Sequence, residues 1–275
     1  MWQVLRRPRW LGYLALAVVF AVTTAGLGLW QWNRHEDRVE RRAVVEANYG
    51  GAPVPIDGVL GTDTPPQEGE RWSRVEVTGR YLPEEQHLVR NRPYAGVYGY
   101  EVVVPLELAD GTAVAVDRGW VRNAPTAEQL PEVPDAPTGE VTVTGWVQPS
   151  EPSLGREPVE GQLASISIED LTRATSLDLR AGYLVLQSEA PAPPTRPTPL
   201  AAPDTGLGSH LAYALQWWLT VPVGLVLVLV MARREAQDEG LVPTPHEPAD
   251  EIDASSGPRR SRRPRKVRIW DEEDG

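Results

Sequence analysis

A histidine and three large aromatic residues open one of the chain's long apolar stretches, in the segment SHLAYALQWW at residues 209–218. If a helix begins near His210, then Tyr213 and Trp217 lie on the same face of that helix as His210, because residues three, four and seven apart are neighbours on a helix. A neutral imidazole nitrogen is a standard axial ligand of haem iron, and flat aromatic walls suit the macrocycle. The same pattern is typical of an interfacial belt, in which His and Tyr side chains reach polar headgroups. Both interpretations stay open from these residues alone.

Gln216 lies in the same segment but on another face, about 120° around the helix from His210 at about 100° per residue. An amide without a partner is costly in hydrocarbon. We therefore expect its side chain to contact the first apolar helix or a partner helix, and to join helices rather than to belong to the histidine face.

Arg118 lies in the segment AVDRGWV, where it continues an alternating strand directly after Asp117. One interpretation is an arginine that faces a partner or binds a propionate group. The other is an ion pair with Asp117 or with another acid at the end of the strand, and it is favoured because exposed arginines on strands are common.

Motifs of common enzymes are absent from the sequence. The four histidines, His35, His87, His210 and His246, have no metal-ligand spacing, and there is no HExxH motif, nucleophile elbow or phosphate loop. The chain contains no cysteine, which excludes a disulfide framework and a thiolate metal site. We therefore expect a protein that is not an enzyme, with a membrane-anchored hydrolase as a distant alternative.

Two uncharged stretches of 21 residues, at 10–30 and 211–231, are too apolar for a soluble fold. Each would form about 31 Å of helix at about 1.5 Å per residue, which matches a bilayer core of about 30 Å. Tryptophan and tyrosine residues accompany both stretches, as they do at membrane interfaces. The sequence therefore predicts transmembrane helices at 10–32 and 210–232, with the first kept as an uncleaved anchor.

The charges around the second span predict its orientation. Arg233 and Arg234 follow it at once, whereas the last basic residue before it is Arg196. By the positive-inside rule the C-terminus is cytoplasmic, and two spans then place the N-terminus on the same side. The expected location is the plasma membrane of a bacterium, with lipid as one partner. The central segment, 33–209, carries 15 arginines and 27 acidic residues, and this net charge near −12 argues against nucleic acid as a partner.

Between the spans the hydrophobic period changes to two, with a hairpin signal at Asp110–Gly111 and a predicted helix N-cap at Ser167. The expected fold is a β-rich (α+β) extracytoplasmic domain, a small barrel or sandwich, flanked by two transmembrane α-helices. The predicted boundaries are 1–9 for the N-terminus, 10–32 for the first span, 33–70 for a helical extension and connector, 71–190 for the β-rich domain, 191–209 for a Pro-rich tether, 210–232 for the second span and 233–275 for a disordered charged tail.

Five short motifs occur in order along this frame: GLWQWNR, VEVTGRYL, VRNRPYAGVYGYEVVVPLEL, AVDRGWV and HLAYALQWW. Together they resemble the surfeit locus protein one family of cytochrome c oxidase assembly factors, in an actinobacterial-type member. Asp117 and Trp218 stand where the family commonly has Asn and Phe. The matching residues in the first, fourth and fifth motifs are Gly28, Trp30, Gln31, Arg34, Arg118, Gly119, Trp120, His210, Tyr213, Gln216 and Trp217.

The resemblance implies a function. Members of the family are chaperone-like factors that help to insert haem a into subunit I of the haem-copper oxidase. The resemblance implicates His210 alone as the ligand of the haem iron, and gives Arg118 a structural or partner-contact role. Tyr213 and Trp217 are candidate haem contacts from the helical spacing. The competing expectation is a membrane-anchored scaffold that docks oxidase subunits without binding haem.

Overall fold

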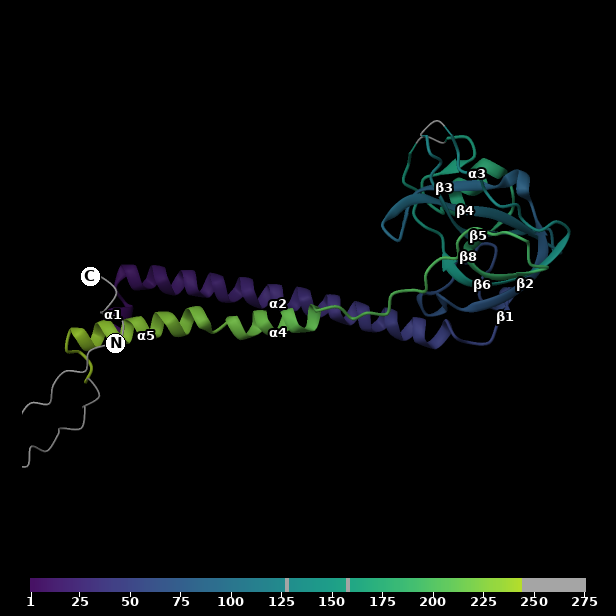
Figure 1. Cartoon of the computed structure of the whole chain (residues 1–275). Helices are drawn as coiled ribbons and strands as arrows, with labels where there is room; N and C mark the ends of the chain where they lie inside the picture. Colours follow the sequence, from purple (N-terminus) through teal and green to yellow (C-terminus); the bar gives the residue numbers. More distant parts are fainter. Residues whose placement is uncertain (127–128, 157–158, 244–275) are drawn as a thin grey trace, which may run out of the picture. The chain divides into compact units, whose positions relative to one another are not determined.

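The structure is a computed structural model that describes residues 1–126, 129–156 and 159–243 (Figure 1). The chain divides into two compact units, one formed by Met1–Ala21 with Pro222–Gly275 and the other by Val22–Val221. The predicted charged tail beyond residue 243 lies outside the described residues.

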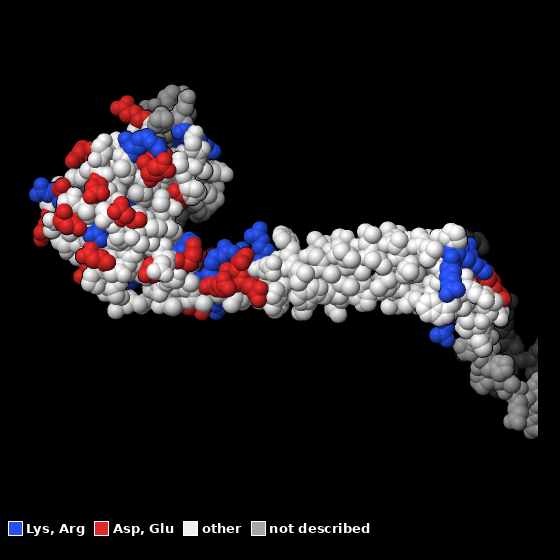
Figure 2. Space-filling model, turned by 180° about the vertical axis from the view of Figure 1, so that it is seen from behind, with Lys and Arg blue, Asp and Glu red and all other residues white. Residues whose placement is uncertain are grey.

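A short helix, α1 (Trp2–Leu5), precedes the long helix α2 (Pro8–Asn48). Pro8 suits the first turn of a helix, where its missing N–H costs no hydrogen bond. With 41 residues, α2 contains both the predicted first span and the charged extension behind it. By length and composition α2 is a candidate membrane span. In Figure 2 the helical part of the molecule has a long white stretch without Lys, Arg, Asp or Glu on the side shown.

The second apolar segment forms two helices where a single one was expected, α4 (His210–Thr220) and α5 (Val223–Asp238). Pro222 separates them because proline has no N–H with which to continue the helical ladder. At this interruption the Thr220 hydroxyl donates to the carbonyl oxygen of Trp217 at 2.7 Å, and the Val221 N–H donates to that of Trp218 at 3.2 Å. Together α4 and α5 are a second candidate membrane span.

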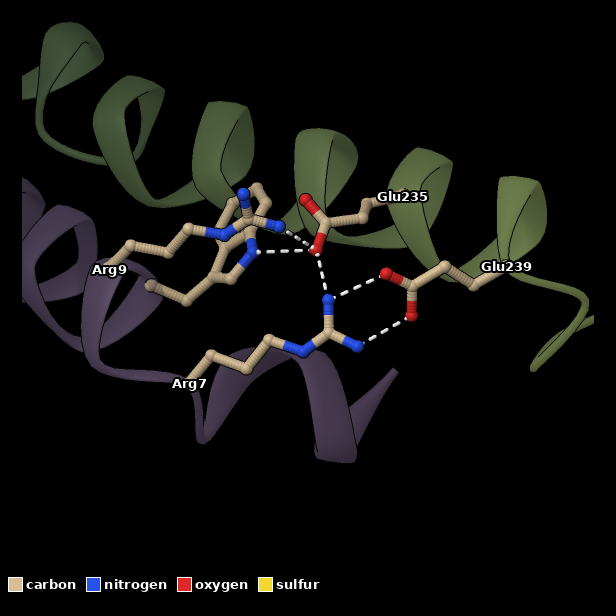
Figure 3. A network of polar contacts seen from close by, with 5 residues as sticks. Arg7, Arg9, Glu235 and Glu239 are labelled. Carbon is tan, nitrogen blue, oxygen red and sulfur yellow. Dashed lines mark hydrogen bonds and ion pairs between the residues drawn. The ribbon is translucent and has the colours of Figure 1, made fainter.

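Charged side chains from the start of the chain bind the end of α5 (Figure 3). Arg7 donates to Glu235 at 2.7 Å and to both carboxylate oxygens of Glu239 at 2.6 Å. Glu235 also accepts from Arg9, and from the indole N–H of Trp10 at 3.3 Å. These contacts explain why the helix continues to residue 238, beyond the predicted start of the disordered tail at 233.

The second unit contains an eight-stranded sheet, so the predicted β-rich domain between two long apolar helices is confirmed. Its strands are β1 (Val54–Pro55), β2 (Arg74–Tyr81), β3 (His87–Tyr94), β4 (Val97–Leu108), β5 (Ala113–Arg122), β6 (Glu140–Pro149), β7 (Gln162–Leu163) and β8 (Leu179–Ala190). Their order is β1–β2–β6–β8–β5–β4–β3–β7, and β2 also pairs with β4. The pairings therefore run from β2 through β6, β8, β5 and β4 and return to β2.

The local signals in the sequence correspond to turns and caps. Strands β4 and β5 form a hairpin around Asp110–Gly111, where the carboxylate of Asp110 accepts from the Thr112 N–H at 2.9 Å. Helix α3 (Ile168–Thr175) begins after Ser167, whose hydroxyl accepts from the Asp170 N–H at 3.2 Å.

The two faces of the sheet bury two separate clusters of apolar side chains. Along β5, Val114 and Val116 belong to the first cluster and Ala113 and Ala115 to the second, because successive strand residues point to opposite faces. The second cluster also contains residues of α3. The first cluster includes Ile56 and Leu60, so the folded domain begins within the predicted connector and before residue 71.

The end of α2 is attached to the sheet. The rings of Tyr49 and Trp146 stack with centroids 4.2 Å apart, and the Trp146 indole donates to the carbonyl oxygen of Tyr49 at 3.0 Å. The Asn48 amide donates to the carbonyl oxygens of Gly69 and Arg71. These contacts fix where α2 leaves the β-domain.

Candidate functional site

His210 is the first residue of α4, and its ring is hydrogen bonded to α2. Its Nδ1 lies 2.9 Å from Oε1 of Gln31. An amide oxygen can only accept, so Nδ1–H donates and the other ring nitrogen, Nε2, keeps its lone pair. The contact joins the first and the fifth sequence motifs, whose residues are 179 positions apart.

Two further contacts pack the face of α2 that carries Gln31 against α4. Gly28 lies against Trp218, and a Cβ at Gly28 would stand 2.2 Å from Nε1 of that indole. The ring centroids of Trp32 and Trp218 are 5.8 Å apart. Gly28, Gln31 and Trp32 lie three and four residues apart and therefore share one face of α2. The helices can approach here because Gly28 has no side chain.

Trp30 and Arg34, which belong to the same motif of α2, form a separate pair. Trp30 is 54% exposed, and the guanidinium carbon of Arg34 lies 5.7 Å from the centre of its ring. This is a cation–π contact on an exposed surface. The structure does not bring these two residues together with His210.

The predicted aromatic face of α4 is split. Ala214, one turn after His210, is fully buried, whereas Tyr213 is 47% exposed and Trp217 is partly buried. His210 therefore turns towards α2, and Tyr213 lies on the outer surface of the described chain.

Gln216 is exposed, and within the described part of the chain its side chain makes no hydrogen bond. The expected polar contact between the two apolar segments is made by Gln31 instead. A partner helix stays the predicted contact of Gln216.

The loop before His210 is bound to α2. Arg38 donates to the carbonyl oxygen of Gly206 at 3.1 Å and lies 3.7 Å from the carboxylate of Asp204. Asp204 also accepts from the Gly206 N–H at 2.8 Å. Gly208 has a φ of +64°, and a Cβ there would lie 3.6 Å from Nε2 of His210. A residue without a side chain therefore stands beside this nitrogen.

Arg118 forms a buried ion pair with an acid of β8. The Arg118 side chain donates to the carboxylate of Glu189 at 3.0 Å. The Arg118 side chain is 0% exposed and the Glu189 side chain 1% exposed. Arg118 also donates to the carbonyl oxygens of Pro134 and Asp135. The Tyr81 hydroxyl donates to Glu189 at 2.9 Å, and burial together with the nearby Glu189 charge raises the pKa of this phenol. The Arg118 side chain thus has a structural role and is not open to a partner or a propionate group.

Gly119 and Trp120 bind the Pro-rich tether to β5. Trp120 and Thr198 exchange two backbone hydrogen bonds of 2.8 Å. Gly119 has a φ of +124°, and a Cβ there would stand 2.5 Å from the carbonyl oxygen of Thr198. Only glycine suits both the backbone conformation and the close approach. The segment 191–209 is therefore fixed to the sheet at Thr198, although the sequence predicts a polyproline-like tether.

A cluster of charged groups, of which Asp117 is buried and the others are partly buried, lies next to these residues. Arg92 contacts Glu101 at 2.9 Å and Glu151 at 2.5 Å. Asp117 is 1% exposed; one of its carboxyl oxygens accepts from the Gly119 N–H at 3.0 Å, and the other has no hydrogen-bond partner among the described residues. Burial raises the pKa of Glu101 to about 7, and burial together with Glu101 raises the pKa of Asp117 well above its usual value. The cluster therefore changes charge near neutral pH.

Several residues of these sites were not singled out from the sequence. No local signal points to Glu189, because 71 residues separate it from Arg118. The glycines of GLGSH, directly before the helix, are a local signal that could have pointed to Gly208. Trp32 lies within the first motif, and its ring contacts with Trp218 and His35 distinguish it from the exposed Trp30.

Comparisons with known proteins agree with the motifs. The model of the SURF1 family matches residues 18–220. An uncharacterized SURF1-like protein of Mycobacterium tuberculosis is 30% identical over 230 residues, which cover 80% of this chain and 83% of that protein. A relative in Mycobacterium bovis matches to the same extent. A SURF1-like protein of Monosiga brevicollis is 28% identical over 247 residues, 83% of this chain and 90% of its own.

Proposed function

Because the chain belongs to the SURF1 family, known broadly as oxidase assembly factors, we propose that it assists haem a insertion into subunit I of a haem-copper cytochrome c oxidase. His210 is the proposed transient ligand of the haem iron. The observation that carries this proposal is the contact of its Nδ1 with Gln31, which leaves Nε2 for the iron. The protein would act as a chaperone that holds and releases the cofactor, and not as an enzyme.

The surroundings of His210 fit a haem. Its Nδ1 is already used within the protein, and the residue beside Nε2 is a glycine. Tyr213 and Trp217 offer aromatic surface on the same helix, and Tyr213 is exposed enough to contact a ligand. A neutral imidazole next to flat apolar groups is the donor set that haem proteins use.

Each residue has a limited task in this proposal. A bound haem would supply an iron that accepts a nitrogen ligand from the protein. His210 would provide this nitrogen, and the exposed ring of Tyr213 and the partly buried ring of Trp217 would offer aromatic surface to the cofactor. A site with one ligating residue would suit transient holding of the cofactor.

We further propose that α2 and the α4–α5 segment span the plasma membrane, with both termini in the cytoplasm and the β-domain outside. Arg233 and Arg234 behind the second apolar segment support this orientation. His210 would then lie at the outer edge of the bilayer, and the β-domain would contact subunit I. The ring of strand pairings through β2, β6, β8, β5 and β4 supports a small barrel as the form of this domain.

The test compares redox difference spectra of the purified wild type, His210→Ala and His35→Ala, each produced in cells that synthesise haem a. We expect a haem a spectrum in the wild type and in His35→Ala and a loss of the signal in His210→Ala. Equal haem content in all three proteins would contradict the proposed ligand. A haem-free protein that still co-purifies with the oxidase would favour the alternative scaffold function.

A further inference from the structure

Gln31 and His210 form a contact that has a chemical as well as a structural consequence. In a neutral imidazole only one nitrogen carries a proton, and the partner of one nitrogen decides which tautomer is present. The amide oxygen of Gln31, 2.9 Å from Nδ1, selects the tautomer with the proton on Nδ1. In that tautomer Nε2 carries the lone pair, and Nε2 is the nitrogen beside Gly208.

The position of Gln31 is fixed by its neighbours on α2. Gly28, one turn before it, lies against the indole of Trp218, and Trp32, next in the chain, contacts the same indole. The amide is therefore held between two contacts that set the distance between α2 and α4. Loss of the amide oxygen would leave the helices packed but would remove the acceptor for His210.

We infer that Gln31 is a positioning residue, which holds His210 as the Nδ1–H tautomer and so presents the lone pair of Nε2 to a haem iron. The part of this inference that concerns iron rests on the proposed function. The part that concerns the tautomer does not, because the hydrogen bond exists in the protein without any ligand. Such outer contacts orient a ligating imidazole, and their loss typically weakens metal binding by roughly 10- to 100-fold.

The chain offers a matched control for this contact. Gln31 and Gln216 are both glutamines on apolar helices, but only Gln31 touches the histidine ring, whereas Gln216 is exposed. Gln31→Leu removes the acceptor and keeps a side chain of similar size. Gln31→Glu keeps an acceptor oxygen at the same place. Gln216→Leu repeats the change of residue type away from the ring.

The first measurement uses the full chain in lipid nanodiscs, without haem and with ¹⁵N-labelled histidine. The His210 signal is assigned by its absence in His210→Ala. We expect the wild type and Gln31→Glu to show Nδ1–H, Gln31→Leu to shift towards the Nε2–H tautomer that free histidine prefers, and Gln216→Leu to match the wild type. If the wild-type ring carries its proton on Nε2, or if Gln31→Leu leaves the tautomer unchanged, the inference is wrong.

The second measurement titrates the same proteins with ferric haem and follows the Soret band. Affinity should fall by roughly 10- to 100-fold in Gln31→Leu, recover in Gln31→Glu and stay unchanged in Gln216→Leu. Equal affinity of Gln31→Leu and the wild type would contradict the positioning role towards iron. A wild type that binds no haem at all would contradict the proposed function, while the tautomer measurement would still decide whether Gln31 positions the ring.

Discussion

Arg118 and Glu189 are joined by an ion pair of 3.0 Å from which solvent is excluded on both sides. The two residues come from β5 and β8, which are neighbours in the sheet. Their charges balance one another, and backbone carbonyl groups and the Tyr81 hydroxyl add further hydrogen bonds, although Nε of Arg118 has no partner among the described residues. Removal of either partner would leave the other as an unpaired charge in the interior.

Arg118→Met should therefore destabilise the β-domain by about 3–5 kcal/mol, because Glu189 stays buried without its partner. Denaturant unfolding of the full chain, followed by circular dichroism, measures this loss. The double variant Arg118→Met/Glu189→Gln should be more stable than Arg118→Met alone, since it removes the orphaned charge. An Arg118→Met protein as stable as the wild type would show that the pair does not hold the domain together.

The carboxyl group of Glu101 should make stability depend on pH. Its pKa is raised from 4.5 to about 7 in the folded protein, so the folded state binds its proton more tightly than the unfolded chain does. Binding of this proton contributes on the order of 3 kcal/mol to the free energy of unfolding. The contribution is fully present below about pH 4.5 and is lost as the pH rises through about 7. Glu101→Gln should flatten the decline between pH 5 and pH 8 in unfolding experiments. Glu76→Gln, on an exposed position of β2, is the control and should keep the wild-type slope.

Asp117→Asn should stabilise the protein at pH 8 more than at pH 5. The pKa of Asp117 is raised well above its usual value by burial and by Glu101, so ionisation of this carboxyl group opposes folding. An amide has no such charge, and its gain should grow as the pH rises. The difference between the midpoints of unfolding at the two pH values measures the effect, and an identical difference in wild type and variant would contradict it.

Gly119→Ala should release the tether from β5. The new Cβ would meet the carbonyl oxygen of Thr198, in a backbone conformation with a φ of +124°. A strain of about 1–3 kcal/mol should speed amide hydrogen exchange at Thr198 by roughly 5- to 150-fold. Gly111→Ala is the matched control: it also has a positive φ, of +85°, but faces open space at the hairpin and should not affect Thr198. Unchanged exchange at Thr198 in Gly119→Ala would show that the bridge does not depend on this glycine.

Arg7→Gln should loosen the end of α5. Arg7 holds Glu235 and Glu239, and the amides of Glu239 and Gly240 close the last turn behind them. These two amides should exchange faster in the variant, whereas amides earlier in α5 should not. Arg6→Gln changes an exposed arginine next to it and serves as the control.

Elements with strong local patterns could be predicted from the sequence. The uncharged stretch after Trp10 lies in α2, the alternating segments are strands, and Ser167 caps α3. The break at Pro222 had a local signal too, but the length and hydropathy of the segment pointed to one continuous helix. The start of the β-domain was placed too late because Ile56 and Leu60 lie in a stretch rich in proline and glycine.

Contacts between distant parts of the chain could not be predicted. The motifs identified Gln31 and His210, but only the packing of α2 on α4 shows that they touch. Likewise, the alternatives for Arg118 differed in its partner, and the contact with Glu189 depends on the register of β5 against β8. A single sequence holds no direct signal of such register.

The interruption between α4 and α5 has a consequence for the environment that the segment can tolerate. A break in a helix normally leaves carbonyl groups without donors, and these need water or another polar group, which hydrocarbon does not provide. Here Thr220 and Val221 supply donors to the carbonyl groups of Trp217 and Trp218. Two of the carbonyl groups at the interruption therefore have donors from within the chain, which lowers the cost of placing the break away from water.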